Sequence, residues 1–437
     1  MTIDNTWLST LKEESDCAFT DQITFKPSAV FSDGQIRLMQ SPPMQPQTWD
    51  EYVFKRFSSY YKHLLKNAHT LIIAFDNYQF VPISKSMTQN SRRKHIPTVT
   101  FHESNPLPCM VPCGEAWMQH MANRTFKNKL IDMLTFRLPG LLLSQHPTKC
   151  IIIDYEKPII YRMSDGEMVS ETIDDIPALG EADVKFTRWA NKFGKLLVDS
   201  IDGDSIPIAL MNHERLLQQE TDPPQVSIYR YKINLEKPVR ETGNKEKQPR
   251  KRAPKEYEYV HIPTLYLCIQ DGIRQCLGKM TAPFHKGHEV RMVIALIGLT
   301  GTDFNRHLPQ LSGKTLWENL VFLWAGLMVA YDPLSQQLRV PAALQHVVCK
   351  IYQLKFHKIL GPIPALTYSK AYEILQSNPK LAARTKASLA PEPQITTTIL
   401  NVNWVLQYWT CEPPPNPISE QFGYKADHNN KVSYMDS

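Results

Sequence analysis

Two closely spaced pairs of acidic residues stand out in the sequence: Glu181 with Asp183, and Asp202 with Asp204. Carboxylates held this close repel one another and raise each other's pKa, so a positive charge is expected between them. Hard divalent ions such as Mg²⁺ and Mn²⁺ take oxygen ligands and can also bind substrate phosphates. The two pairs therefore predict a divalent-metal site within residues 180–206.

The segment between the two pairs is predicted to hold one helix and one strand. Apolar residues recur at helical spacing from Phe186 to Phe193, so the first pair falls at the start of a helix, where the helix dipole favours negative charge. The apolar run 196–198 is typical of a buried strand, and the second pair lies just past its end.

Two earlier acids also follow predicted strands. Residues 28–31 form a short apolar segment before Asp33 and Gly34, which is either a strand that delivers Asp33 at its end or a simple turn. A predicted amphipathic helix leads into the apolar run 71–75, typical of a parallel strand buried on both faces, and Asp76 follows at once. Because ligands of α/β folds bind beyond the carboxyl ends of the strands, Asp33 and Asp76 join the candidate ligands.

Basic residues follow in the polar segment behind this strand, namely Lys85, Arg92 and Arg93. Cations so close behind a strand-end carboxylate are well placed to hold a phosphate while a metal polarises it, and a solvated loop is the alternative. The run 149–154 predicts a further buried strand, which 158–161 could join as a hairpin, and its last residue, Asp154, is another candidate ligand.

The composition is that of an ordinary globular protein of 437 residues, with 42% hydrophobic and 21% charged residues. The net charge of +6 permits a polyanionic partner without requiring one. The 8 cysteines are irregularly spaced and do not resemble a disulfide framework, which favours an intracellular protein. The N-terminus lacks a secretory pattern, and the longest apolar run, 320–331, is shorter than the roughly 20 residues that cross a bilayer. We therefore expect a soluble protein with no membrane partner.

A basic insertion interrupts the second half of the chain. Residues 225–234 alternate like an edge strand or a hairpin arm, and residues 236–257 then become polar and strongly basic, as expected of a disordered surface segment. Its cluster Arg250, Lys251 and Arg252 is typical of a nuclear localisation signal or of a nucleic-acid-binding arm, two roles that do not exclude each other. This cluster favours the nucleus over the cytoplasm.

The chain beyond the insertion is predicted to be mostly helical. Residues 289–299 form an apolar helix, and residues 315–376 read as helical around a buried run at 320–331. The tail from residue 413 begins with a proline-rich stretch and is expected to be extended or disordered.

Together these motifs resemble one family. The sequence GEAD, the 21 positions from Glu181 to Asp202 in DGD, and the later GTDF at Asp303 are similar to the flap endonuclease and XPG-like superfamily of structure-specific nucleases. Asp76 with Lys85 and Arg92 or Arg93 is similar to the strand-end aspartate, lysine and arginine of the same enzymes. The stretch GTDFNRHLPQLSGKTL, with Lys314 near its end, looks like the start of their helical DNA-binding element.

The resemblance implies an α/β, PIN-like fold with a central, mainly parallel sheet flanked by helices, followed by a helical C-terminal extension. It implies two Mg²⁺ or Mn²⁺ ions. Asp33, Asp76, Glu181 and Asp183 would serve mainly one ion, and Asp183, Asp202, Asp204 and Asp303 the other. Lys85 and Arg92 or Arg93 would neutralise the scissile phosphate, with no side chain needed as a general base. The implied partner is DNA cut at 5′ flaps or ends, and we expect a monomer.

The resemblance also suggests how the chain is divided. The first part of the nuclease core would span residues 1–235, with the basic insertion at 236–257. The end of the core and the start of the DNA-binding element would span 258–312, followed by a helical region at 313–412 and the tail at 413–437.

Other functions fit parts of the same pattern. GTDFNRHLP also resembles a segment of 5′-to-3′ exoribonucleases, so RNA is the second candidate substrate. Asp202-Gly203-Asp204-Ser205 resembles phosphatases with an aspartyl nucleophile, although the order of its residues differs. The N-terminus and the loop before Lys314 depart from the family, as they would in a nuclease-like binding or scaffold protein. The acids could also be ordinary solvated residues.

Overall fold

The computed structural model describes residues 5–39, 43–77, 99–176, 180–231, 256–277, 287–300, 313–361, 363, 366–378, 391–410, 422, 424–426 and 432–434. Three of the predicted cations, Lys85, Arg92 and Arg93, lie outside these residues, as do Asp303 and the cluster Arg250, Lys251 and Arg252.

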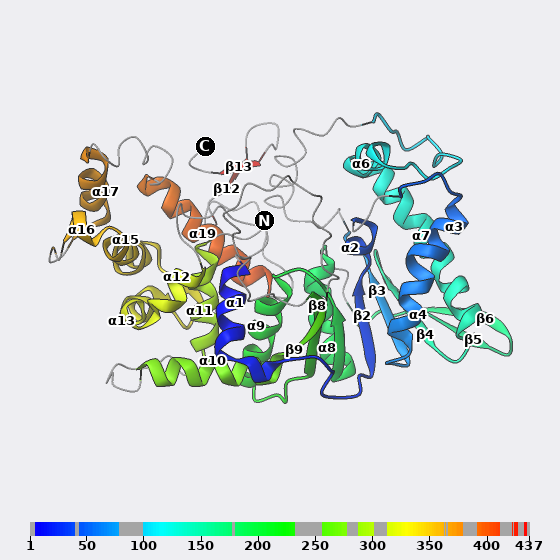
Figure 1. Cartoon of the computed structure of the whole chain (residues 1–437), viewed down its shortest axis with the longest axis horizontal. Coiled ribbons are helices and arrows are strands. Elements are labelled where there is room, and N and C mark those ends of the chain that lie inside the picture. Colours follow the sequence, from blue (N-terminus) through cyan, green and yellow to red (C-terminus); the bar gives the residue numbers. More distant parts are fainter. Residues whose placement is uncertain are drawn as a thin grey trace, which may run out of the picture.

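A nine-stranded sheet forms the centre of the fold (Figure 1). Five neighbouring strands are parallel, in the order β4 (Cys150–Asp154), β3 (Thr70–Ala74), β2 (Ala29–Asp33), β7 (Lys195–Asp199) and β8 (Gln225–Tyr231). Antiparallel strands extend both sides, β5 (Pro158–Ser164) and β6 (Glu167–Thr172) beyond β4, and β9 (Tyr257–His261) and β1 (Phe19–Thr20) beyond β8. The predicted mainly parallel sheet is confirmed, including the strand that ends at Asp33.

The order of the parallel strands has a functional consequence. Along the chain they are the third, second, first, fourth and fifth parallel strands, so the winding direction changes between β2 and β7. In open α/β sheets this change creates a crevice outside the carboxyl ends of the two strands, where ligands bind.

One expectation about the sheet is wrong in part. Residues 225–231 form a hairpin arm with β9, as one of the two alternatives proposed, but β8 is not an edge strand. It lies between β7 and β9 because its alternate residues Val226 and Ile228 are also apolar and are buried on the second face. The prediction of an edge strand had rested on the residues of one face of the strand alone.

Helices cover both faces because successive strand residues point to opposite sides. Phe31 and Ile72 belong to one apolar cluster, whereas Val30 and Leu71 belong to the other. The second cluster is closed by α2 (Gly34–Met39), α3 (Trp49–Val53), the π-helical turn 54–58, α4 (Ser59–Leu65), α6 (Glu115–Ala122) and α7 (Arg124–Gln145). The first is closed by α8 (Ala182–Phe193), α9 (Ser205–Gln218), α10 (Ile262–Leu277) and α11 (Glu289–Gly298).

Helices from both ends of the chain continue the first cluster. The N-terminal α1 (Asn5–Glu14) packs on α12 (Gly313–Glu318), where Trp7 is fully buried. Further helices follow at α13 (Leu320–Ala330), α14 (Val340–Ala343), the π-helical turn 344–348, α15 (Cys349–Lys355), α16 (His357–Leu360), α17 (Tyr368–Ser377) and α19 (Glu392–Tyr408). Their buried residues join the sheet face in one continuous apolar cluster.

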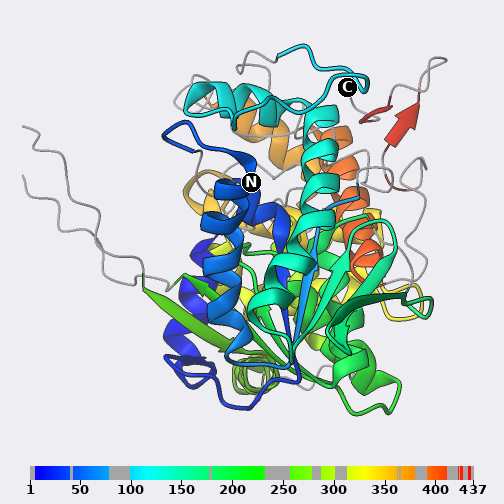
Figure 2. The same cartoon turned by 90° about the vertical axis from the view of Figure 1, so that its right-hand side faces the viewer.

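Two further strand pairs accompany these helices. β10 (Tyr331–Asp332) pairs with β11 (Gln337–Leu338), and this small hairpin interrupts the predicted helical region. In the tail, expected to be extended or disordered, β12 (Tyr424–Ala426) pairs with β13 (Val432–Tyr434), drawn in red in Figure 2. Phe422 just before them is buried, and its carbonyl oxygen accepts a hydrogen bond of 2.6 Å from Asn401 Nδ2.

The run 320–331 is helical up to Ala330 but not uniformly buried, which corrects the sequence-based expectation. Leu323, Trp324 and Leu327 face the core, whereas the side chains of Phe322 and Val329 are 65% and 48% exposed. A helix that is apolar all round must leave one face outside when it packs on the surface of a core. Among the helices that the structure describes, none is both long enough and apolar enough to cross a membrane.

His213 in α9 predicts a pH dependence of stability. Its ring packs against Tyr266 of α10 with 4.9 Å between the ring centroids, and burial, aided by the charge of His261, lowers the pKa of His213 to about 4. A lowered pKa means that this contribution to stability is complete above the ordinary value near 6.5 and is lost as the pH falls through 4. We expect the free energy of unfolding of the wild type to fall by up to roughly 3 kcal/mol more than that of His213→Phe between pH 7 and pH 4. Equal losses in urea titrations at the two pH values would contradict this.

Candidate functional site at the carboxyl edge of the sheet

The structure brings six predicted acids to the carboxyl edge of the sheet. Asp33 ends β2, and Asp76 follows β3 by two residues. The other four acids flank the helices on either side of β7: Glu181 is the N-cap of α8, Asp183 lies in its first turn, and Asp202 and Asp204 lie between β7 and α9. Because β3, β2 and β7 are parallel neighbours, their carboxyl ends lie along one edge (Figure 1).

Direct hydrogen bonds join the end of β3 to the start of α8. Asp76 Oδ1 accepts a hydrogen bond of 3.1 Å from the backbone N–H of Ala182, and the backbone N–H of Asn77 donates to the Gly180 carbonyl oxygen at 2.6 Å. A carboxylate at a helix N-terminus satisfies a backbone donor that has no partner within the helix. Asp76 and Glu181 are therefore held together although 105 residues separate them in the sequence.

Asp33 lies both at the end of a strand and in a tight turn, the two conformations between which the sequence left the choice open. It is the last residue of β2, and its Oδ1 also accepts a hydrogen bond of 3.0 Å from the backbone N–H of Ile36 in the first turn of α2. The next residue must be glycine, because a Cβ atom at Gly34 would lie 2.6 Å from the Phe75 ring. The strand end and the tight turn thus place Asp33 beside the segment that carries Asp76.

The second acidic pair lies in a short loop held by its own polar side chains. Asp202 Oδ1 accepts a hydrogen bond of 3.2 Å from the backbone N–H of Asp204, and the hydroxyl groups of Ser200 and Ser205 lie 2.7 Å apart. Asp204 is the N-cap of α9 and is only 2% exposed, whereas Asp202 is half-buried. The loop presents Asp202 toward solvent and keeps Asp204 inside.

Arg230 supplies positive charge close to this loop, and sequence reasoning did not identify it. Its side chain, on β8, is buried, and burial lowers the pKa of the guanidinium, while the charges of Glu258 and Asp202 raise it. In the sequence, Arg230 appears only as a basic residue within an alternating strand. Such a pattern cannot show which acidic side chain the arginine approaches.

Two other strand-end acids are neutralised by side chains. Asp199, at the end of β7, accepts hydrogen bonds from Ser32 Oγ at 2.8 Å, Tyr60 Oη at 2.7 Å and Arg37, whose Nη2 lies 2.7 and 2.8 Å from its two oxygens. The sequence-based interpretation passed over Asp199, although it directly follows the run Leu196-Leu197-Val198.

Asp154, at the end of β4, is engaged by α8. Its carboxylate lies 2.9 Å from Lys185 Nζ and accepts a hydrogen bond of 2.7 Å from Trp189 Nε1. Lys185 Nζ also lies 3.0 to 3.1 Å from the carbonyl oxygens of Phe75, Asp154 and Tyr155. The structure therefore assigns Asp154 a structural role, which corrects its interpretation as a candidate ligand.

Three of the six predicted acids, Asp33, Asp76 and Asp202, accept hydrogen bonds from backbone N–H groups. Four of the six are nearly inaccessible: Glu181 is 0% exposed, Asp204 2%, Asp33 5% and Asp76 7%. Burying several ionised carboxylates at one edge costs free energy unless positive charge is nearby.

The six acids offer the type of ligand atom that a hard divalent ion prefers, but their arrangement does not form a compact group of ligands. All six acids offer carboxylate oxygens, the ligands that Mg²⁺ and Mn²⁺ prefer. Within the described ranges, however, no three His, Cys, Asp or Glu side chains are grouped so that they could hold a metal ion. The seventh predicted ligand, Asp303, lies outside those ranges.

Lys314, a predicted nucleic-acid-binding residue, lies on α12. Its Nζ is 3.6 Å from the carboxylate of Glu318 one helical turn later, and both side chains are about half exposed. Such an exposed pair contributes little to stability.

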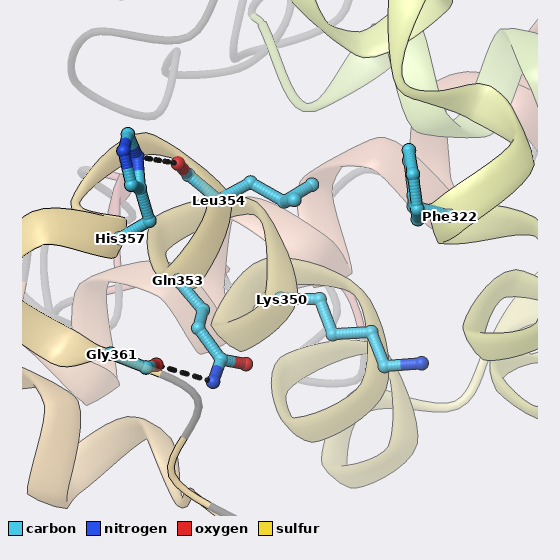
Figure 3. A pocket seen from close by; sticks show the side chains of 6 residues that line it. All are labelled: Phe322, Lys350, Gln353, Leu354, His357 and Gly361. Carbon is cyan, nitrogen blue, oxygen red and sulfur yellow. Dashed lines mark hydrogen bonds between the residues drawn. The ribbon is translucent and has the colours of Figure 1, made fainter.

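A separate pocket of about 460 Å³ lies among the C-terminal helices (Figure 3). Phe322 of α13 faces Leu354 and Lys350 of α15 across it. Hydrogen bonds from Gln353 Nε2 to the Gly361 carbonyl oxygen, at 3.0 Å, and between His357 Nδ1 and the Leu354 carbonyl oxygen, at 3.2 Å, shape one wall. The described residues that line it include no carboxylate and none of the six acids of the edge.

Comparison with known proteins finds no matching family model and no matching curated protein.

Proposed function

We propose that the chain is a divalent-metal-dependent nuclease of the flap endonuclease and XPG-like class, with a PIN-like core and a helical C-terminal extension. The observation that carries the proposal is the convergence of acids from four separate chain segments at the carboxyl edge, where the sheet changes its winding direction between β2 and β7. Acids that merely face solvent would not be expected to gather at one edge of a sheet, and four of the six predicted acids are buried.

In this proposal each residue has a defined task. Asp33, Asp76, Glu181 and Asp183 would hold one Mg²⁺ or Mn²⁺ ion, and Asp183, Asp202, Asp204 and Asp303 the second. Bound ions would supply Lewis-acid activation for hydrolysis of a phosphodiester. The backbone N–H groups that donate to Asp33, Asp76 and Asp202 orient these carboxylates.

Cations complete the proposed site. Arg230 offsets negative charge next to Asp202. Lys85, Arg92 and Arg93 would neutralise the substrate phosphate, and Lys314 with Arg250, Lys251 and Arg252 would contact the backbone of the nucleic acid. We propose DNA with a 5′ flap or a free 5′ end as the substrate, a monomeric protein, and a location in the nucleus.

A nuclease assay with three substrates tests the proposal. We expect cleavage of 5′-flap DNA that needs Mg²⁺ or Mn²⁺, and a decrease of more than about 100-fold in the variant Asp202→Ala/Asp204→Ala. Single-stranded DNA and 5′-monophosphorylated RNA are the comparison substrates, and preferential cleavage of RNA would shift the assignment to a ribonuclease. Asp175→Ala is the matched control, because this exposed acid pairs with Lys192 on the outer part of α8.

Two results would contradict the nuclease proposal. Cleavage that survives the double substitution, in protein whose circular dichroism matches the wild type, would remove the acidic edge from the mechanism. Binding of nucleic acid without cleavage of any substrate would support the second candidate, a nuclease-like binding protein. That candidate is favoured by the lack of a three-residue metal group among the described residues.

A further inference from the structure

Four tyrosines occupy one face of the β8–β9 pair. Tyr229 is the register partner of Tyr259, and Tyr231 that of Tyr257. Because strand residues two apart point to the same side, all four rings share one face. Ile228 and Val260 point to the opposite face, where they join the apolar cluster closed by α9 and α10.

The four rings form a continuous ladder. Tyr229 and Tyr257 are stacked with 4.7 Å between centroids and 10° between planes, and Tyr229–Tyr259 and Tyr231–Tyr257 each have centroids 5.0 Å apart. Each side chain is half-buried, so the ladder is accessible. We call these four residues the tyrosine ladder.

The tyrosine ladder adjoins the acidic edge. Tyr229 is the register partner of Asp199, the last residue of β7, and Asp202 follows three residues later in the chain. Arg37, which binds Asp199, also lies over the Tyr60 ring, with its guanidinium carbon 3.4 Å from the centroid. The tyrosine ladder therefore starts beside the ion pair at the carboxyl end of β7, on the sheet face opposite to α8 and α9.

Charge and chemistry favour one kind of ligand for this face. Tyrosine rings are uncharged at neutral pH and do not repel phosphates. Burial raises the pKa of Tyr229 and of Tyr257 further, to about 12. Uncharged aromatic rings stack on nucleobases of any sequence. The chain that joins Tyr231 to β9 includes the basic sequence 245–255, and polyanions are the ligands that such a charge attracts.

We propose that the tyrosine ladder binds the unpaired bases of single-stranded nucleic acid by stacking. The part of this inference that leads the strand onward to the acidic edge rests on the proposed nuclease function, whereas the stacking itself does not. A packing role within the hairpin accounts for contacts between the rings but not for their accessible, uncharged face beside a buried acidic edge.

Binding measured in EDTA tests the stacking directly, because no metal-dependent cleavage can then interfere. We expect Tyr257→Leu and Tyr229→Leu each to weaken the affinity for a fluorescent single-stranded oligonucleotide about tenfold or more, while the Tyr→Phe variants bind like the wild type. Affinity for a blunt duplex should change little. Tyr161→Leu is the control, since Tyr161 is also half-buried but lies on β5, near the opposite edge of the sheet.

Photocrosslinking of the wild type provides a readout that does not depend on the folding of any variant. An oligonucleotide containing 5-iodouracil should crosslink to tyrosines of the ladder, as mapped by mass spectrometry.

Crosslinks confined to Phe322 or His357 of the C-terminal pocket would overturn the proposal. So would leucine variants that bind single strands like the wild type, or light scattering that shows a dimer which these variants dissociate. Stacking without cleavage would refute the nuclease function alone, and cleavage by leucine variants with unchanged binding would refute the tyrosine ladder alone.

Discussion

Replacing Lys185 by methionine is expected to lower the free energy of unfolding by about 3–5 kcal/mol, because it leaves a buried carboxylate without its cation. Lys185 and Asp154 have side chains that are 2% and 3% exposed, and 2.9 Å separates their charged atoms. The ammonium group also lies within hydrogen-bonding distance of three carbonyl oxygens at the ends of β3 and β4. Methionine matches the length of the lysine stem but donates no hydrogen bond.

The same helix provides a control of equal chemistry. Lys192 lies 2.7 Å from Asp175, but these side chains are 35% and 69% exposed. Lys192→Met should cost at most about 1 kcal/mol, since water screens an exposed pair. Asp154→Asn added to Lys185→Met removes the stranded charge and keeps an acceptor for Trp189 Nε1, so it should recover much of the loss. Equal chemical-denaturation curves for Lys185→Met and Lys192→Met would contradict the role of burial.

Gly326→Ala is expected to destabilise the protein by at least about 2 kcal/mol, although alanine is the better helix former by about 1 kcal/mol. Gly326 is buried in α13, and a Cβ atom there would overlap the carbonyl oxygen of His346 in the following helical segment. A backbone atom cannot turn away as the end of a flexible side chain can. The two helical segments would have to move apart, with loss of packing around Trp324.

Gly140→Ala is the matched opposite case. Gly140 lies within α7 and is exposed, and an added Cβ would meet no atom within 4 Å beyond its chain neighbours and the backbone of its own helix. The substitution should therefore stabilise the protein by about 0.5–1 kcal/mol. Thermal unfolding should move the two alanine variants in opposite directions, and a loss of stability in both would show that helix propensity does not govern the exposed site.

The organisation of the acidic edge explains why so many carboxylates can be buried together. Asp199 and Asp154, on either side of the candidate site, are each satisfied by a cation and by neutral donors. Among the predicted ligands, Asp33, Asp76 and Asp202 accept hydrogen bonds from backbone N–H groups. Both kinds of donor offset the cost of burying carboxylates at one edge.

Local patterns in the sequence determined most of the elements. The parallel strands before Asp76 and Asp154, and the helix capped by Glu181, could be predicted because burial on one or both faces imposes its own spacing on neighbouring residues. At Asp33 the sequence left a strand and a turn open. The capping box of Thr48 and Glu51 is also local, because the two side chains satisfy backbone N–H groups within one helical turn. The type and the bounds of a helix or strand could therefore be predicted wherever the residues that determine them lie within that element.

Only the tertiary structure decided which residues meet. The pairing of Asp154 with Lys185, the burial of Asp199 beside Arg37, and the tyrosine ladder on β8 and β9 join parts of the chain that are separated by about 30 to 160 residues. No local spacing encodes such contacts, because they depend on the order in which strands enter the sheet. The acidic pairs at 181–183 and 202–204 were visible as sequence, but the winding of the sheet placed them at one edge and assigned the neighbouring acids to structural ion pairs.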